Sequence, residues 1–212
     1  MSIEVSNVFN IYSKIAHHFS STRFSKWSWI TEFVETFPNN STICDIGCGN
    51  GRNMMYKNLN FIGIDSCSEF LEICKNKNLK VLLSDMCKLP LNSNSFDGII
   101  SIASFHHLST KLRQQKALDE MYRILKDDGL CLLSVWSINQ PKKTKRTFSN
   151  YGNNLVEWRK NDKVYNRFYY IFKIEEIKEL IHNSNFTLVS HKWDCGNEIF
   201  ILKKNLKLKF NY

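Results

Sequence analysis

Three glycines at alternating positions, Gly47, Gly49 and Gly51, follow Asp45, and a second acid, Asp65, lies further along the chain. Each acid closes an apolar run typical of a β-strand. Glycine lets a turn adopt positive φ angles and approach a bulky ligand closely. An acid at the end of the next strand can accept hydrogen bonds from both ribose hydroxyls. The pattern therefore predicts a nucleotide pocket built on two adjacent strands.

The spacing of the glycines indicates which ligand the pocket takes. The chain reads G-x-G-x-G, whereas the dinucleotide fingerprint of nicotinamide enzymes reads G-x-G-x-x-G. We therefore expect S-adenosylmethionine as the cofactor and a methyltransferase rather than an oxidoreductase. A structural turn without a ligand is the alternative for the loop alone, and Asp65 argues against it.

Polar residues also follow the other predicted strands. Ligands of open α/β sheets bind beyond the carboxyl ends of the strands, so these residues share one rim with the glycine loop. Asp85 is predicted to accept a hydrogen bond from the adenine amino group, with Met86 packed on the ring. Asp45 and Ser101 are candidates for the methionyl amine. The alternative for Asp85 is an acid that stabilises a turn. The alternative for Asp45 and Ser101 is that each is a strand-end group whose hydrogen bonds are made within the protein.

Two histidines and a tryptophan complete the rim. Of the adjacent His106 and His107, we expect His106 to face the pocket and His107 to be structural. Trp136 ends the fifth strand, where it either packs in the core or stacks on a base. The sequence has no C-x-x-C pair and no carboxylate or cysteine at ligand spacing from the histidines, so no metal site is predicted.

The order of the elements predicts an α/β fold. Two amphipathic helices are expected before residue 38, because apolar residues recur there at helical spacing. Strands and helices then alternate, which predicts a seven-stranded, mostly parallel sheet with helices on both faces and an antiparallel C-terminal hairpin. The predicted strands are 42–46, 61–65, 80–84, 96–103, 130–136, 186–193 and 198–202, and the predicted helices after residue 38 are 50–57, 68–75, 111–125 and 174–181.

The length of 212 residues suits a single domain. Residues 137–170 are polar, basic and aromatic without clear periodicity, so we expect a substrate-binding loop there. The expected segments are the N-terminal helices (1–38), the cofactor-binding core (41–136), the substrate loop (137–170), the C-terminal helix and hairpin (171–204) and a basic tail (205–212).

The net charge of +9 favours a polyanionic partner because the basic residues are clustered. One cluster comes directly after the fifth predicted strand and is expected to contact such a partner, while a charge that serves only solubility is the alternative. Its members are Lys142, Lys143, Lys145 and Arg146.

No apolar run approaches the ~20 residues of a membrane span, and the N-terminus does not begin like a signal peptide. The seven cysteines are scattered through apolar contexts, which is typical of reduced core cysteines. A cytoplasmic protein, or one that is also nuclear, is therefore expected.

Several longer stretches resemble one enzyme family, the eukaryotic tRNA wobble-uridine methyltransferases that esterify 5-carboxymethyluridine. This family includes the methyltransferase module of the AlkB-homologue tRNA-modifying enzyme and its stand-alone fungal counterpart. The resemblance covers roughly residues 8–204. Its most specific stretches are A-x-H-F-S-x-T-R at 16–23 and I-S-I-A-x-x-H-H-x-S-T at 100–110, supported by 45–51, 135–136, Gln140, 167–170 and 197–200.

The resemblance implies the class I S-adenosylmethionine-dependent methyltransferase (Rossmann-like) fold and a tRNA anticodon loop as substrate. In that reaction Arg23 is assigned to position the substrate carboxylate, with Arg167 as second candidate. His106 and Tyr12 would shape the pocket, and Trp136 would stack on the uracil.

The resemblance also implies a small zinc-binding activator subunit that pairs with the edge strand of the sheet. That strand would contain Lys80, Val81, Leu82 and Leu83, whose unbroken apolar run is a liability on an edge unless something covers it. Core packing against the flanking helices is the alternative.

The chain departs from the family pattern at 24–27 and at 156–158, and no oxygenase or RNA-recognition domain is attached, so methyl transfer alone is expected. Two other functions stay open. One is a methyltransferase for a small carboxylic acid or another small molecule, and the other is a catalytically silent RNA-binding or scaffold protein with the same fold.

Overall fold

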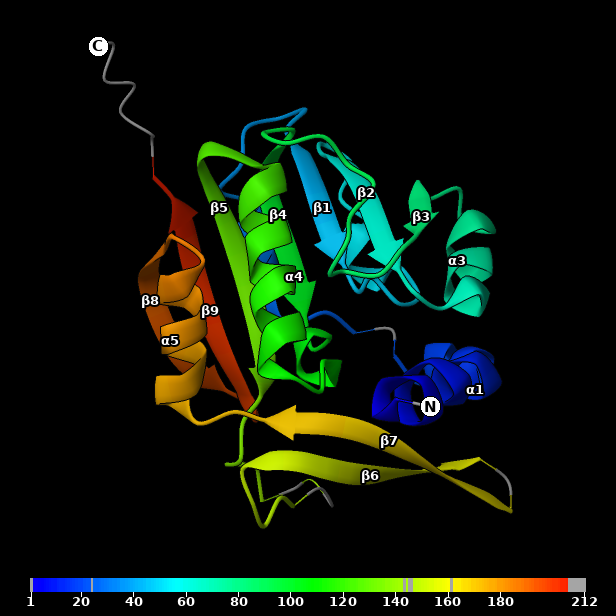
Figure 1. Cartoon of the computed structure of the whole chain (residues 1–212). Helices are drawn as coiled ribbons and strands as arrows, with labels where there is room; N and C mark the ends of the chain where they lie inside the picture. The colour runs from blue at the N-terminus through cyan, green and yellow to red at the C-terminus, as the bar shows by residue number, and fades with distance from the viewer. Residues whose placement is uncertain (1, 24, 143, 145–146, 161, 206–212) are drawn as a thin grey trace, which may run out of the picture.

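A seven-stranded sheet forms the centre of the protein in a computed structural model that describes residues 2–23, 25–142, 144, 147–160 and 162–205 (Figure 1). The strand order is β3-β2-β1-β4-β5-β9-β8. Strands β1 to β5 are parallel, and β9 and β8 are antiparallel to their neighbours, which confirms the predicted fold. The bounds are β1 (Thr42–Ile46), β2 (Asn60–Asp65), β3 (Val81–Leu83), β4 (Phe96–Ile102), β5 (Leu125–Trp136), β8 (Phe186–Asp194) and β9 (Asn197–Lys204).

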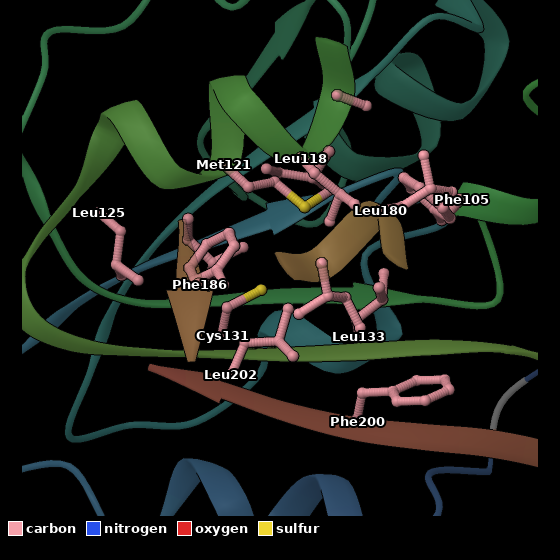
Figure 2. Packing of buried hydrophobic residues seen from close by; sticks show 14 of the residues in the cluster. Phe105, Leu118, Met121, Leu125, Cys131, Leu133, Leu180, Phe186, Phe200 and Leu202 are labelled. Carbon is pink, nitrogen blue, oxygen red and sulfur yellow. The ribbon is translucent and has the colours of Figure 1, made fainter. Parts of the chain in front are cut away.

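Helices cover both faces of this sheet, which explains why its central strands are almost continuously apolar. On one face, α4 (Lys111–Ile124) and α5 (Ile174–Asn183) pack on β5 and β9. Figure 2 shows Leu118 and Met121 of α4 and Leu180 of α5 pointing into this cluster.

The opposite face is covered by α2 (Ser28–Val34) and α3 (Ser68–Lys75). Trp29 of α2 and Leu71 of α3 belong to the same cluster as Ile100 of β4.

The N-terminal segment lies close to the carboxyl ends of the parallel strands (Figure 1). It consists of a π-helical turn, η1 (Val5–Phe9), followed by α1 (Asn10–Ser21), so the first expected helix is present. Apolar residues of this segment pack on α3 and on strand β7 (Lys163–Ile171), in a cluster that includes Ile15 and Phe70.

The prediction of a loop at 137–170 is wrong, because much of this segment forms a second, two-stranded antiparallel sheet. The hairpin consists of β6 (Gly152–Lys160) and β7 (Lys163–Ile171), and it runs beneath the carboxyl ends of the main strands (Figure 1). Phe168 and Tyr169 are both buried, although neighbours in a strand point to opposite faces. Both faces of β7 are therefore covered there, and the sequence lacks the alternation of apolar and polar residues that predicts a half-buried strand.

Two other expected boundaries also change. The helix expected at 50–57 is a single 3₁₀ turn, η2 (Arg52–Met54), in a stretch rich in asparagine and glycine, which are poor helix formers. The helix expected at 111–125 is present and ends at Ile124, whereas the strand expected at 130–136 begins earlier, as β5 starts at Leu125. Among the described residues, no helix is long and apolar enough to cross a membrane.

Candidate functional site

A cavity of ≈ 360 Å³ opens at the carboxyl ends of the parallel strands. Its walls come from the glycine loop, the ends of β2 and β3, the N-terminal segment, β7 and the turn before β9. The cavity brings together nine of the residues that the sequence predicts for the site. These are Tyr12, Arg23, Gly47, Gly49, Asp65, Asp85, Met86, Trp136 and Arg167.

The glycine loop needs its first two glycines for different reasons. Both have a positive φ, +77° at Gly47 and +53° at Gly49. A Cβ on Gly47 would lie 2.3 Å from Cβ of Ser104, so the close approach of these two segments requires glycine there. A Cβ on Gly49 would meet no atom within 4 Å and would instead stand in free space on the cavity wall. Gly49 thus leaves room for a ligand.

The Asp65 carboxylate closes this part of the cavity. One oxygen accepts a hydrogen bond from the Gly49 N–H (2.8 Å), and the other accepts one from the Cys67 N–H (2.9 Å). Burial raises the pKa of Asp65, and these backbone hydrogen bonds oppose the shift. The open cradle at Gly49 and the acid beside it fit the adenosyl group of S-adenosylmethionine, with Asp65 placed for the ribose.

Asp85 and Met86 line the same cavity at the end of β3. The Asp85 carboxylate accepts hydrogen bonds from the Cys87 N–H (2.9 Å) and from the Arg113 guanidinium (2.7 Å). Burial alone would raise the pKa of Asp85, but these hydrogen bonds outweigh it and lower the pKa below its usual value. Asp85 is therefore an ionised acceptor at neutral pH, as adenine recognition requires.

Three of the residues predicted to bind the cofactor do not line the cavity in the described structure. Gly51 is needed for packing, since a Cβ there would lie 2.3 Å from Leu79. The Ser101 hydroxyl is buried and donates to the Ile46 carbonyl oxygen (3.1 Å). This agrees with the alternative given above, in which Ser101 makes its hydrogen bond within the protein. Asp45 is fully buried, neither of its oxygens has a hydrogen-bond partner among the described residues, and burial raises its pKa to about 8.

The expectation for the histidine pair is reversed by the structure. His107 lines the cavity, whereas His106 is fully buried and accepts a hydrogen bond from the Trp136 N–H at Nδ1 (3.0 Å). Both lie in the 3₁₀ turn η3 (Phe105–His107). Successive residues of such a turn point about 120° apart, so only one of two neighbours can face the cavity.

His107 ends a directed chain of hydrogen bonds. Its Nδ1 contacts the Phe168 carbonyl oxygen (2.7 Å), so Nδ1 carries the proton and Nε2 accepts from the Tyr12 hydroxyl (3.0 Å). Tyr12 in turn accepts from the Tyr169 hydroxyl (3.2 Å), which accepts from Arg167 (2.7 Å). Burial lowers the pKa of His107 to about 3, so the ring is neutral, in agreement with this direction.

Two arginines converge at the end of the chain of hydrogen bonds. Arg23 and Arg167 lie against the same indole, with their Cζ atoms 5.4 and 4.9 Å from the Trp158 ring centroid. Arg167 is only 3% exposed, and its buried Nε has no hydrogen-bond partner among the described residues. Burial and the neighbouring Arg167 lower the pKa of Arg23.

Within the described part of the chain, no acidic side chain forms an ion pair with either arginine. Two adjacent guanidinium groups without a carboxylate partner in the described residues, one of them with a buried N–H that has no acceptor there, have the chemistry to bind an anion.

Trp136 stacks on Tyr169, with ring centroids 4.2 Å apart and planes 8° from parallel. One face of its indole is therefore covered, and Trp136, which is 9% exposed, is one of the residues that line the cavity. Asn197, beside it across the β5–β9 ladder, donates from Nδ2 toward two turn carbonyls, and its Oδ1 has no partner among the described residues.

Sequence reasoning gave no role to Glu4, Arg113 or Trp158. Glu4 and Arg113 carry no local motif, because their contacts join segments far apart in the chain. Trp158 lies two residues after Val156 in a stretch that gave no strand signal.

Of the basic cluster, only Lys142 falls within the described residues, and its side chain is exposed. Lys143, Lys145 and Arg146 lie outside them. No group of three or more metal-ligating side chains converges in the parts of the chain that the structure describes.

Comparisons with known proteins agree with this geometry. A family model described as "Methyltransferase domain" matches residues 44–133. A solved structure of a SAM-dependent methyltransferase from Methanosarcina mazei shares the fold, with a TM-score of 0.69 at 17% identity over 82% of this chain and 97% of that one. The match to a methyltransferase domain agrees with S-adenosylmethionine as the predicted cofactor.

Two curated relatives are more similar in sequence. One, from Arabidopsis thaliana and named tRNA (carboxymethyluridine(34)-5-O)-methyltransferase, is 44% identical over 65% of this chain, which spans 34% of that protein. The other, from Schizosaccharomyces pombe and with the same name, is 33% identical over 97% of this chain and 100% of its own length. The chain thus spans about a third of one relative and all of the other. It belongs to the family of the tRNA (carboxymethyluridine(34)-5-O)-methyltransferases.

Proposed function

We propose that this protein transfers the methyl group of S-adenosylmethionine to the carboxylate of 5-carboxymethyluridine at the wobble position of a tRNA anticodon. The observation that supports the proposal most directly is the pair of guanidinium groups of Arg23 and Arg167, which line the same cavity as the cradle at Gly49 and Asp65. The names of the relatives from Arabidopsis thaliana and Schizosaccharomyces pombe support the same substrate.

The chemistry suits a site without a general base. A carboxylate is already ionised near neutral pH, so no proton has to be removed before the reaction. The cofactor supplies an electrophilic methyl group on a sulfonium. A carboxylate oxygen forms the new bond to the methyl carbon while the carbon–sulfur bond breaks and its electron pair stays on sulfur, giving a methyl ester and S-adenosylhomocysteine.

The residues of the chain act by orientation. Arg167 is fixed by Tyr169, and Tyr169 by Tyr12, so the guanidinium that would hold the substrate carboxylate is itself held in place. Such orientation can supply several kcal/mol of the barrier reduction. The neutral His107 accepts the last hydrogen bond of the chain and takes no proton from the substrate. We assign Trp136, which lines the cavity, to contact the uracil.

The anticodon loop is single-stranded, so presenting its base costs less than extracting one from a duplex. The cluster that includes Lys142 would meet the phosphates of the anticodon stem. Changing Lys142, Lys143, Lys145 and Arg146 to glutamate should weaken tRNA binding without changing S-adenosylmethionine affinity.

The edge of the main sheet fits a protein partner. Strand β3 pairs only with β2 in the described structure, and Leu82 and Leu83 are 40% and 61% exposed. A small zinc-binding activator subunit that adds a strand here would cover both leucines. Leu83→Lys should abolish co-purification with that subunit, whereas Leu112→Lys, at a similarly exposed leucine on α4, should not.

One experiment tests the whole proposal. The protein, with and without the zinc-binding subunit, is incubated with labelled S-adenosylmethionine and tRNA that carries 5-carboxymethyluridine, and the digested nucleosides are identified by mass spectrometry. We expect label in the methyl ester of that nucleoside alone. Methylation of free carboxylic acids in place of tRNA would show a small-molecule enzyme, and failure to bind the cofactor would show a scaffold. A cytoplasmic or nuclear location stays a prediction.

A further inference from the structure

The side chain of Glu4 is buried at the wall of the cavity although it stands near the N-terminus. It is only 3% exposed. One carboxylate oxygen accepts from the N–H and the hydroxyl of Ser109, at 2.7 and 2.8 Å. The other accepts from Nε of Arg113, at 2.8 Å. A buried carboxylate with three donors holds the N-terminal segment firmly against the start of α4.

Arg113 carries this contact on to the site. Its Nη2 donates to Asp85 at 2.7 Å, so one guanidinium bridges the carboxylates of Glu4 and Asp85. All three side chains line the cavity. Because a guanidinium is planar and presents its N–H groups in a rigid fork, fixing Nε on Glu4 also fixes the direction of the bond to Asp85.

The other end of the N-terminal segment is attached to the glycine loop. Nδ2 of Asn50 donates to the Arg23 carbonyl oxygen at 2.9 Å and to the Ser20 hydroxyl at 3.2 Å. The segment that carries Tyr12 and Arg23 is therefore tied at both ends to residues around the cofactor cavity.

We propose that Glu4 and Arg113 are positioning residues that hold Asp85 toward the 6-amino group of the cofactor adenine and fasten the acceptor-site helix to the adenine end of the cavity. The inference rests on the assignment of Asp85 to adenine recognition, which belongs to the proposed function. It adds the residues that orient the Asp85 carboxylate. Binding of adenine then stabilises the segment that holds Tyr12 and Arg23, so the acceptor site is completed when the cofactor is bound.

The test compares two ligands by titration calorimetry, S-adenosylhomocysteine and S-inosylhomocysteine, which has an oxygen in place of the 6-amino group. The wild-type protein should bind the adenosine compound at least about tenfold more tightly, as expected when a charged acceptor loses its donor. Glu4→Gln and Arg113→Lys should each remove most of this preference. Glu179→Gln, which breaks the exposed Lys111–Glu179 pair (2.8 Å) at the start of the same helix α4, should keep it.

A folded Glu4→Gln variant with the wild-type preference would overturn the inference. A second measurement uses only the wild-type protein. At equal saturation, S-adenosylhomocysteine should protect the amides of residues 5–12 from hydrogen exchange more than S-inosylhomocysteine does, and equal protection would also overturn the inference.

The outcomes separate this inference from the proposed function. If the wild-type protein binds neither compound, the proposed function fails. If Asp85→Asn removes the preference but Glu4→Gln and Arg113→Lys do not, only the inference fails.

Discussion

Arg23 and Arg167 meet on the Trp158 ring although they lie far apart in the sequence. Their Cζ atoms lie 5.4 and 4.9 Å from the indole centroid, and Trp158 also donates from Nε1 to His18 of α1 (3.2 Å). The indole reduces the repulsion between two like charges because its electron-rich face attracts cations. This arrangement keeps two guanidinium groups together until an anion arrives.

Replacing Arg167 by methionine should lower kcat/KM for carboxymethylated tRNA about 10- to 100-fold, because a charged hydrogen bond to the substrate is lost. The affinity for S-adenosylhomocysteine should stay unchanged. Steady-state kinetics and calorimetry measure the two effects. Arg159→Met, on the same hairpin but exposed and paired with Glu157 (2.8 Å), is the matched control. Equal kinetic losses in both variants would refute the role of Arg167.

Replacing Gly49 by alanine should weaken cofactor binding, because the new methyl group occupies the free space on the cavity wall. Gly152 offers a close control, since it also has a positive φ and an added Cβ would meet no atom within 4 Å, but it lies on the hairpin outside the cavity lining. Both variants should lose about 1–2 kcal/mol of folding stability from the left-handed backbone. Only Gly49→Ala should lower the affinity for S-adenosylhomocysteine, by roughly tenfold. A normal affinity would contradict the cradle.

His107 should make the protein less stable in mild acid. Its folded-state pKa is about 3, whereas an unfolded histidine titrates near ~6.5. Between these values the unfolded state binds the extra proton, so stability falls as the pH falls, by at most ~1.4 kcal/mol per pH unit. Urea unfolding between pH 5 and 7.5 should show a smaller decline for His107→Gln than for the wild type. Parallel profiles would mean that His107 is not buried in its neutral form.

Asp45 should make the protein less stable as the pH rises, which is the opposite of the effect of His107. Its folded-state pKa is about 8, whereas an unfolded aspartate titrates near ~3.9. The folded state holds the extra proton between these values, so its contribution to stability is lost as the pH rises toward 8. Asp45→Asn, which is neutral at every pH, should therefore be more stable than the wild type at pH 8 in the absence of ligand. A less stable variant at pH 8 would show that the carboxylate is charged and paired.

The main sheet and the cofactor loop were predictable because their signals are local. The strand β4 is an apolar run, and the order of glycines and acids between Asp45 and Asp65 is contained in a short segment. The acceptor half of the cavity was harder to predict. Strand β7 has both faces covered around Phe168, so its pattern resembles no half-buried strand.

The direction in which a side chain points was a second feature that the sequence could not predict. Sequence places His106 and His107 at the same rim but does not say which one turns toward the cavity, since the answer depends on where η3 begins. Contacts between remote segments were equally hidden. Among the described residues, Arg113 joins Glu4 to Asp85 by hydrogen bonds, and no motif near Glu4 in the sequence predicts that partner.

In the described residues, the hairpin of β6 and β7 shares no ladder with the seven-stranded sheet, yet it supplies Arg167 and Tyr169 to the cavity. Under the proposed function, part of the acceptor site is thus carried by a separate ribbon beside the sheet that carries the cofactor loop. Insertions, deletions or exchange of this ribbon should then change which acceptor is methylated while the backbone hydrogen bonds of the main sheet stay intact. For the design of new acceptor preferences, the ribbon is the natural unit to replace.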